Sequence, residues 1–139
     1  MKRMGALEFK KWLETRTRVF SVAVFRMLDG LPRTTSSRVI AYQLGKSASS
    51  IGANYREANR AESGDDFRHK ISIVLKEANE SLYWLEVLHD LYGESKSISS
   101  LLEESQELLK LFQSITRSSR SKLHPSPSPQ SSNPTNPPI

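Results

Sequence analysis

The chain has 139 residues, 37% of them apolar and 25% charged, which suits one globular domain with a core of ordinary size. It contains no cysteine, which excludes disulfides, Cys-based zinc sites, iron–sulfur clusters and thiol catalysis, and a reducing cytoplasm fits this composition. The first 60 residues carry 12 Lys/Arg against 4 Asp/Glu, whereas residues 61–139 carry 8 against 11. This basic half predicts a polyanionic partner such as nucleic acid, and the alternative is a basic surface that is merely solvated.

Proline marks the predicted boundaries of the chain. Six of its seven prolines lie in the last fifteen residues, so the body up to about Lys122 is nearly free of helix breakers. We expect a flexible N-terminus at residues 1–7, a helical body at 8–122, and a disordered tail rich in Pro, Ser and Asn at 123–139. The longest charge-free apolar run near the N-terminus, 19–25, is far shorter than the ~20 residues of a membrane span, so no membrane segment or signal peptide is expected.

The first two predicted helices span 8–31 and about 36 to 60. In the first, apolar residues such as Phe9, Phe20 and Met27 recur on one face, and Pro32 ends it. The second follows a Ser-rich cap region, with Ser36 or Ser37 as its first residue. Its inner stripe is rich in small residues, which permit close packing.

The last two predicted helices span 65–92 and about 98 to 117. Ser63 and the acids that follow supply a cap for the third helix, and Gly93 ends it. The fourth has apolar residues in heptad-like order. Because the connections are short, neighbouring helices should be antiparallel, which predicts an all-α, up-down-up-down four-helix bundle.

Two of these helices have more apolar surface than one core needs. Large groups outside the core stripes favour a protein–protein contact, so we expect a ring-shaped homo-oligomer. The alternative is a helix buried between two neighbours of its own bundle. The residues predicted to lie between subunits are Val22, Phe25, Ile73, Trp84, Val87 and Leu91.

A polar stripe on the second helix is the most specific local pattern. Its members recur at spacings of three and four, directly beside the apolar stripe, and the helices on either side offer partners. We expect a half-buried polar network that fixes which helices pair, centred on Arg16, Asn54, Glu57, Lys70 and Glu77. The full predicted network is Arg16, Gln43, Ser47, Ser50, Asn54, Glu57, Asp66, Lys70, Glu77 and Glu80.

No catalytic, cofactor or metal site is predicted. Glu86 and His89 form a Glu-x-x-His spacing, the kind used in dimetal bundles, but such sites need a second copy from another helix. His69 lies twenty residues from His89 on the same predicted helix, about 30 Å away at 1.5 Å per residue. Glycine-rich phosphate loops and Ser/His/Asp arrangements are also missing from the sequence, so we expect a non-enzymatic protein.

The candidate nucleic-acid contacts are cations of the first two helices and the turn between them. Such a patch provides phosphate contacts and salt-dependent affinity with little sequence readout. The predicted contacts are Lys10, Lys11, Arg18, Arg26, Arg33, Arg38, Lys46, Arg56 and Arg60.

Residues 43–85 also carry a family resemblance. The run Ser50-Ile51-Gly52-Ala53-Asn54-Tyr55-Arg56-Glu57-Ala58, with Asp66-Phe67, Lys76-Glu77-Ala78 and Trp84-Leu85 further on, resembles the four-helix-bundle family encoded in intervening sequences of bacterial 23S ribosomal RNA genes. The likeness covers about 90 residues. Ala58 stands where many members have Gly, and the fourth helix and the tail carry no family motif.

The resemblance implies a small bundle that assembles into a pentameric ring. Some relatives are accessory proteins of diversity-generating retroelements, in which a basic barrel engages RNA and the reverse transcriptase, and no catalytic residue comes with the family. We therefore expect an oligomeric protein that binds RNA or DNA, with a reverse transcriptase as a candidate partner. A protein-interaction scaffold with no nucleic-acid role is the alternative, because fold alone does not determine function.

Overall fold

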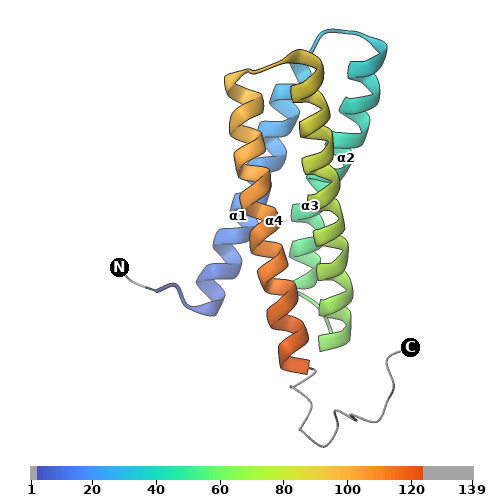
Figure 1. Cartoon of the computed structure of the whole chain (residues 1–139). Coiled ribbons are helices and arrows are strands. Elements are labelled where there is room, and N and C mark those ends of the chain that lie inside the picture. Colours follow the sequence, from blue (N-terminus) through green and yellow to red (C-terminus); the bar gives the residue numbers. More distant parts are fainter. Residues whose placement is uncertain (1–2, 124–139) are drawn as a thin grey trace, which may run out of the picture.

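Four α-helices follow one another along the chain, each antiparallel to the next (Figure 1). They are α1 (Ala6–Asp29), α2 (Thr35–Ala58), α3 (Gly64–Tyr92) and α4 (Lys96–Leu123). This computed structural model describes residues 3–123, and within that range it confirms the predicted all-α, up-down-up-down bundle. The predicted tail lies almost entirely outside the described residues.

Helix starts follow local capping chemistry. Thr34 caps α2, and its hydroxyl accepts a hydrogen bond from the backbone N–H of Ser37, so the helix begins earlier than the predicted Ser36 or Ser37. Ser63 caps α3 as predicted by accepting from the N–H of Asp66, which satisfies a backbone donor that a helix start leaves unpaired. The Asp66 carboxylate accepts from the N–H of Glu62, the residue before the cap.

Helix ends differ from the prediction at three places, and at one of them α2 ends at Ala58 and not at residue 60. α1 ends at Asp29, before the predicted end at Leu31, because a residue that precedes proline disfavours the helical conformation. α4 continues to Leu123, beyond the end of its apolar stripe, since nothing before Pro125 breaks it. At the end of α3, Gly93 adopts a φ of 76°, a conformation that other residues rarely take, and the chain turns there into α4.

The predicted apolar stripes form one core along the axis of the bundle. α1 contributes Leu13 and Phe20 to it, and the Tyr55 ring of α2 meets the Phe112 ring of α4 edge to face at 5.3 Å. The largest fully buried side chains come from all four helices: Leu13, Phe20, Val24, Leu44, Ile51, Tyr55, Ile71, Val74, Leu85, Leu88, Leu108 and Phe112.

Small residues let α1 and α2 approach closely. A Cβ at Gly52 would lie 3.1 Å from Oγ1 of the buried Thr17, so only glycine fits this crossing without displacing α1. Ser21 Oγ of α1 also donates to the carbonyl oxygen of Ala48 in α2, at 3.2 Å. The predicted role of small residues in α2 is thereby confirmed at the α1–α2 crossing.

The four seams of the bundle differ in extent. α2 and α3 pack most extensively and α1 and α4 least, and the first turns of α1 lean away from α4 (Figure 1). Among Phe9, Tyr55, Phe67 and Ile115, this divergence leaves a cavity of about 610 Å³ at the end of the bundle. The α1–α4 seam is therefore the one most dependent on individual polar contacts.

Candidate nucleic-acid interface

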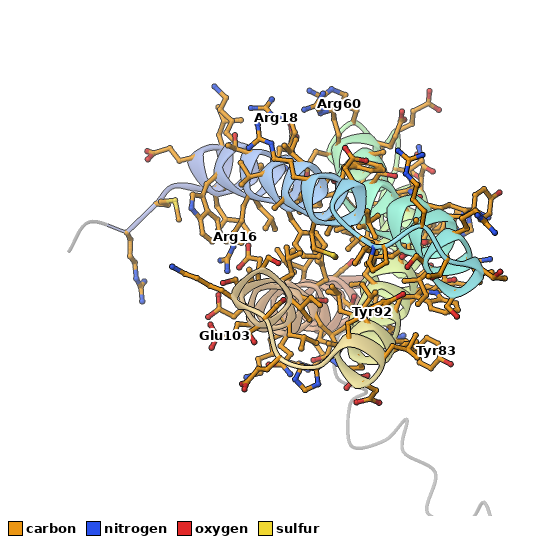
Figure 2. The ribbon with its side chains drawn as sticks, turned by 90° about the horizontal axis from the view of Figure 1, so that it is seen from above. Arg16, Arg18, Arg60, Tyr83, Tyr92 and Glu103 are labelled. Atoms are coloured by element: carbon orange, nitrogen blue, oxygen red, sulfur yellow. The ribbon has the colours of Figure 1, made fainter. Side chains whose placement is uncertain are left out.

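All nine cations predicted to contact nucleic acid have exposed side chains. Four come from α1, four from α2 and its end, and Arg33 lies in the turn that joins the two helices. Figure 2, a view from above, shows Arg18 and Arg60 on the same outer side of the molecule, and Glu103 of α4 on the opposite side. We call the exposed surface of α1, α2 and the turn between them, which carries all nine cations, the basic face.

Most of the basic face lacks acidic partners. Within residues 3–120, whose side chains the structure describes, Lys10, Lys11, Arg18, Arg26, Arg33, Arg38 and Lys46 form no salt bridge. Arg56 and Arg60 do, and both pair with Glu14 of α1, at 3.7 and 3.4 Å. Glu14 also accepts a hydrogen bond from Asn59 Nδ2 at 2.9 Å. One carboxylate therefore holds the end of α2 against α1 and leaves most of the positive charge uncompensated.

Aromatic side chains lie among these cations. Phe25 and Tyr42 have exposed fractions of 45% and 67%, and the Lys46 ammonium lies 6.0 Å from the centre of the Tyr42 ring. The Phe25 ring covers Gly45 of α2, where an added Cβ would lie 3.0 Å from it. Exposed rings beside cations are the features on which unstacked bases pack in proteins that bind single strands.

Charges of both signs are exposed on α3 and α4. Glu86 and Asp90 of α3 and Glu103 and Glu107 of α4 are exposed, and so are the cations Lys76, Lys96 and Lys110. The excess of positive charge in the first half of the sequence is therefore carried by α1, α2 and their turn.

The residues predicted to lie between subunits divide into two groups. Val22, Phe25 and Leu91 are exposed, at 43%, 45% and 53%. Ile73, Trp84 and Val87 are half-buried, and the last two pack partly against the core of their own bundle. Trp84 Nε1 is buried without a hydrogen-bond partner among the described residues. Val22, Phe25 and Leu91 are thus available for a contact, whereas Trp84 and Val87 already use part of their surface inside the chain.

The predicted polar network is wrong at Arg16. This side chain points from α1 toward α4 (Figure 2), and its Nε and Nη2 donate to the two carboxylate oxygens of Glu104, at 2.7 and 2.6 Å. Nη2 also donates to Glu107, and the guanidinium lies 5.1 Å from the centre of the Trp12 ring. The carboxylates raise the pKa of Arg16 above its usual value. Arg16 therefore joins α1 to α4 and makes none of the predicted contacts with α2 and α3.

The other members of the predicted network bond mainly within their own helices. Asn54 Nδ2 donates to the carbonyl oxygen of Ser50, Ser50 Oγ to that of Lys46, and Lys70 Nζ pairs with Asp66 at 3.2 Å. Glu57 is exposed, so the expected burial of its carboxylate is also wrong. No hydrogen bond between Asn54, Glu57, Lys70 and Glu77 exists in the described part of the chain.

Ser47 of the predicted network does form a hydrogen bond between helices, although with a residue outside that network. Ser81 of α3 donates to Ser47 of α2 at 3.0 Å, and both are buried. Gln43 and Glu80 are half-buried. A groove between α2 and α3 is lined by Glu77 and Glu80, together with Lys46 and Trp84. Burial, and then the charge of Glu80, raise the pKa of Glu77.

The described residues contain neither a metal-binding cluster nor a membrane-spanning helix. No group of three or more His, Cys, Asp or Glu side chains within that range lies in a position to hold a metal ion. None of the four helices there is both long and apolar enough to cross a membrane.

Comparison with known proteins identifies the family. The chain is similar to a protein of unknown function from Bacteroides thetaiotaomicron VPI-5482, assigned to the S23 ribosomal protein family, whose crystal structure matches with a TM-score of 0.68 and 36% identity. The match covers 75% of this chain and 97% of the other. No curated protein matches the chain. The family model of the 23S rRNA-intervening sequence proteins matches residues 11–114, nearly the whole bundle, and the chain therefore belongs to this family.

Proposed function

We propose that the protein is a non-enzymatic nucleic-acid-binding protein that contacts RNA or DNA through its basic face. One observation carries the proposal: seven exposed cations of α1, α2 and their turn form no salt bridge within residues 3–120. Cations spread over two helices reach phosphates along a backbone, whereas base readout needs side chains inserted into a groove. Binding is thus electrostatic and weakly sequence-specific.

A charge-reversal experiment tests the basic face. Changing Lys11, Arg18 and Arg26 to Glu should abolish the mobility shift of a structured RNA, because it replaces three positive charges with negative ones. The bundle should still fold, because these three exposed side chains of α1 form no salt bridge in the described chain. The wild-type affinity should fall steeply between low and physiological salt, as counterion release requires. No wild-type binding even at low salt contradicts the proposal and favours a scaffold without a nucleic-acid role.

A matched control separates position from net charge. Reversing Lys76, Lys96 and Lys110 to Glu changes the net charge by the same amount, on exposed positions of α3 and α4. This control variant should lose much less affinity than the α1 variant. Equal losses in the two variants show that only total charge matters. Binding that survives the α1 reversal alone places the contacts on α2, at Arg38, Lys46 and Arg56.

We further propose that the protein acts as a homo-oligomer, with a pentameric ring as the assembly that the family resemblance implies. The exposed Val22 and Phe25 on α1 and Leu91 on α3 support a contact between copies. Light scattering at micromolar concentration should give a multiple of 15.7 kDa. A monomer mass, or a mass unchanged by Phe25→Ser, contradicts this interface.

Assembly and nucleic-acid binding compete for part of α1. Val22 lies between Arg18 and Arg26 on the outer side of the helix, so a subunit that covers Val22 also shields neighbouring cations. Arg38 and Lys46 of α2 then carry more of the contact. The nucleic-acid affinity of the Phe25→Ser variant separates assembly from nucleic-acid binding. If this variant dissociates into monomers and still binds nucleic acid, a single chain suffices for binding.

The partner implied by the family resemblance is a reverse transcriptase. A neighbouring gene for a reverse transcriptase with a template repeat would support it, and co-purification of the two proteins, with and without ribonuclease, tests a direct contact. Loss of the pair after ribonuclease treatment means that RNA joins them.

A further inference from the structure

A small cavity lies between the first turns of α3 and the last turns of α4. Its volume is about 220 Å³, and it is separate from the basic face of α1 and α2. In Figure 1 this is the end of the bundle opposite the α3–α4 turn. Its walls are Arg68, His69, Ile71 and Ser72 from α3, and Thr116, Ser119 and Arg120 from α4.

The guanidinium of Arg68 is only partly satisfied. Nη2 pairs with Asp65, one helical turn earlier, but Nη1 is buried and has no hydrogen-bond partner among the described residues. The Arg68 side chain is 19% exposed, whereas that of Asp65 is 92% exposed. A buried N–H without an acceptor is unfavourable, and an arginine donor forms its strongest hydrogen bonds with anionic oxygens. Nη1 is therefore a donor without an acceptor among the residues that the structure describes, on a residue that lines the cavity.

The rest of the cavity also suits an anion. Arg120 brings a second guanidinium from α4, and no Asp or Glu is among the lining residues. Residues 121–139 contain no Asp or Glu side chain either. The cavity lies by the start of α3, whose backbone dipole favours negative charge, although the exposed Asp65 and the half-buried Asp66 offset part of that field.

Other groups contribute less. The hydroxyls of Ser72 and Thr116 donate to carbonyl oxygens of their own helices, so their protons are already engaged. Recognition thus depends on two guanidinium groups from different helices, which suits a tetrahedral oxyanion with several oxygens better than a single carboxylate.

We propose that this cavity is a phosphate-binding site, in which Arg68 Nη1 and the Arg120 guanidinium hold one phosphate group. The phosphate belongs either to a nucleic-acid strand or to a small phosphorylated compound, and the chemistry of the site is the same for both. The proposal stands apart from the basic face, because neither arginine contributes to that face. If the basic face does not bind nucleic acid, the phosphate site is still tested separately by the experiment below.

Inorganic phosphate is the probe for the site itself. At fixed ionic strength and pH, replacing chloride by phosphate should raise the melting temperature of the wild-type protein, and calorimetric titration should give a saturable binding curve. Arg120→Gln should weaken phosphate binding at least tenfold. Because Arg120 is exposed, this variant should keep the bundle folded. Arg68→Gln should have the same effect, and Arg18→Gln on the basic face is the control that should leave binding unchanged.

Two results would overturn the proposal. One is a wild-type melting temperature that does not distinguish phosphate from chloride at equal ionic strength. The other is Arg120→Gln and Arg68→Gln variants that bind phosphate as tightly as the wild type. If Arg68→Gln fails to fold, the Arg120→Gln measurement decides alone.

A second arm identifies the source of the phosphate. A short oligonucleotide is titrated with and without a 5′-phosphate, on the wild type and on Arg120→Gln. A gain in affinity from the 5′-phosphate that depends on Arg120 assigns the site to the end of a nucleic-acid strand. The other outcome is oligonucleotide binding that changes neither with the 5′-phosphate nor with Arg120→Gln. If inorganic phosphate still binds in an Arg120-dependent way, the site is assigned to a small phosphorylated compound.

Discussion

The hydroxyl of Ser81 donates a 3.0 Å hydrogen bond to the buried hydroxyl of Ser47 in the seam between α2 and α3. This seam is the most extensive in the bundle, and the pair fixes its register at one point. Ser47 can also donate to the carbonyl oxygen of Leu44 in its own helix. Losing the partner therefore does not leave Ser47 wholly unsatisfied.

Two substitutions at Ser81 should differ in size of effect. Ser81→Ala should lower the free energy of unfolding by about 1 kcal/mol, the usual net value of one hydrogen bond. Ser81→Leu should cost about 1–3 kcal/mol or more, because the larger side chain overpacks a fully buried position. Denaturant unfolding measures both, and a Leu variant no less stable than the Ala variant contradicts the tight seam.

Arg16→Met should loosen the α1–α4 seam. Arg16 and Glu104 are 21% and 28% exposed, so the substitution leaves a partly desolvated carboxylate without its bidentate partner. The expected cost is about 1–2 kcal/mol in the free energy of unfolding. A double-mutant cycle with Glu104→Gln should show coupling of at least about 0.5 kcal/mol. Arg16→Lys should recover little, since one ammonium cannot reproduce the paired contacts.

Gly52→Ala should destabilise the protein although alanine is the better helix former. The propensity gain is about 1 kcal/mol. The new Cβ, however, would lie 3.1 Å from Oγ1 and 3.3 Å from Cβ of Thr17, a β-branched side chain whose hydroxyl donates to the Leu13 carbonyl oxygen. Thermal unfolding checks the sign. A variant stabilised by the full propensity gain shows that α1 moves away freely.

Glu77→Gln should raise the melting temperature at neutral pH. The pKa of Glu77 is higher in the folded protein, chiefly because of burial and then the charge of Glu80, while Lys76 and Lys46 oppose the shift. A raised carboxyl pKa means that the charged form destabilises the fold above that pKa, and the penalty disappears as pH falls toward the ordinary range of glutamate. The advantage of the Gln variant should therefore shrink on acidification, and an advantage independent of pH contradicts this explanation.

The sequence predicted the helices well and their polar contacts poorly, for one physical reason. Periodicity places Phe20, Ile51 and Leu85 on the inner faces of their own helices, and burial in an antiparallel bundle follows directly. The same helical periodicity puts Arg16 beside the apolar stripe of α1, but it does not indicate which neighbouring helix the side chain contacts. Its true partner, Glu104, depends on the rotation of α1 and on the register of α4.

The candidate site shows the same division. Exposure of all nine cations was predictable, because each lies away from an apolar stripe. The shared pairing of Arg56 and Arg60 with Glu14 was not, although their spacing of four residues does put both on one side of α2. The cavity between Arg68 and Arg120 was also missed, since it joins residues from helices whose ends meet only in the folded bundle.

The α1–α4 seam has a kinetic consequence. Arg16 and Glu104 are 88 positions apart, whereas the other seams join helices that are consecutive in the chain. Local helix pairs form with little loop-closure entropy, so the α2–α3 and α3–α4 hairpins should dominate the folding transition state, and α1 should dock on α4 afterwards. Arg16→Met should then accelerate unfolding and leave the refolding rate almost unchanged, the behaviour of a contact made after the rate-limiting step. Stopped-flow chevrons would display this as a shift of the unfolding arm alone.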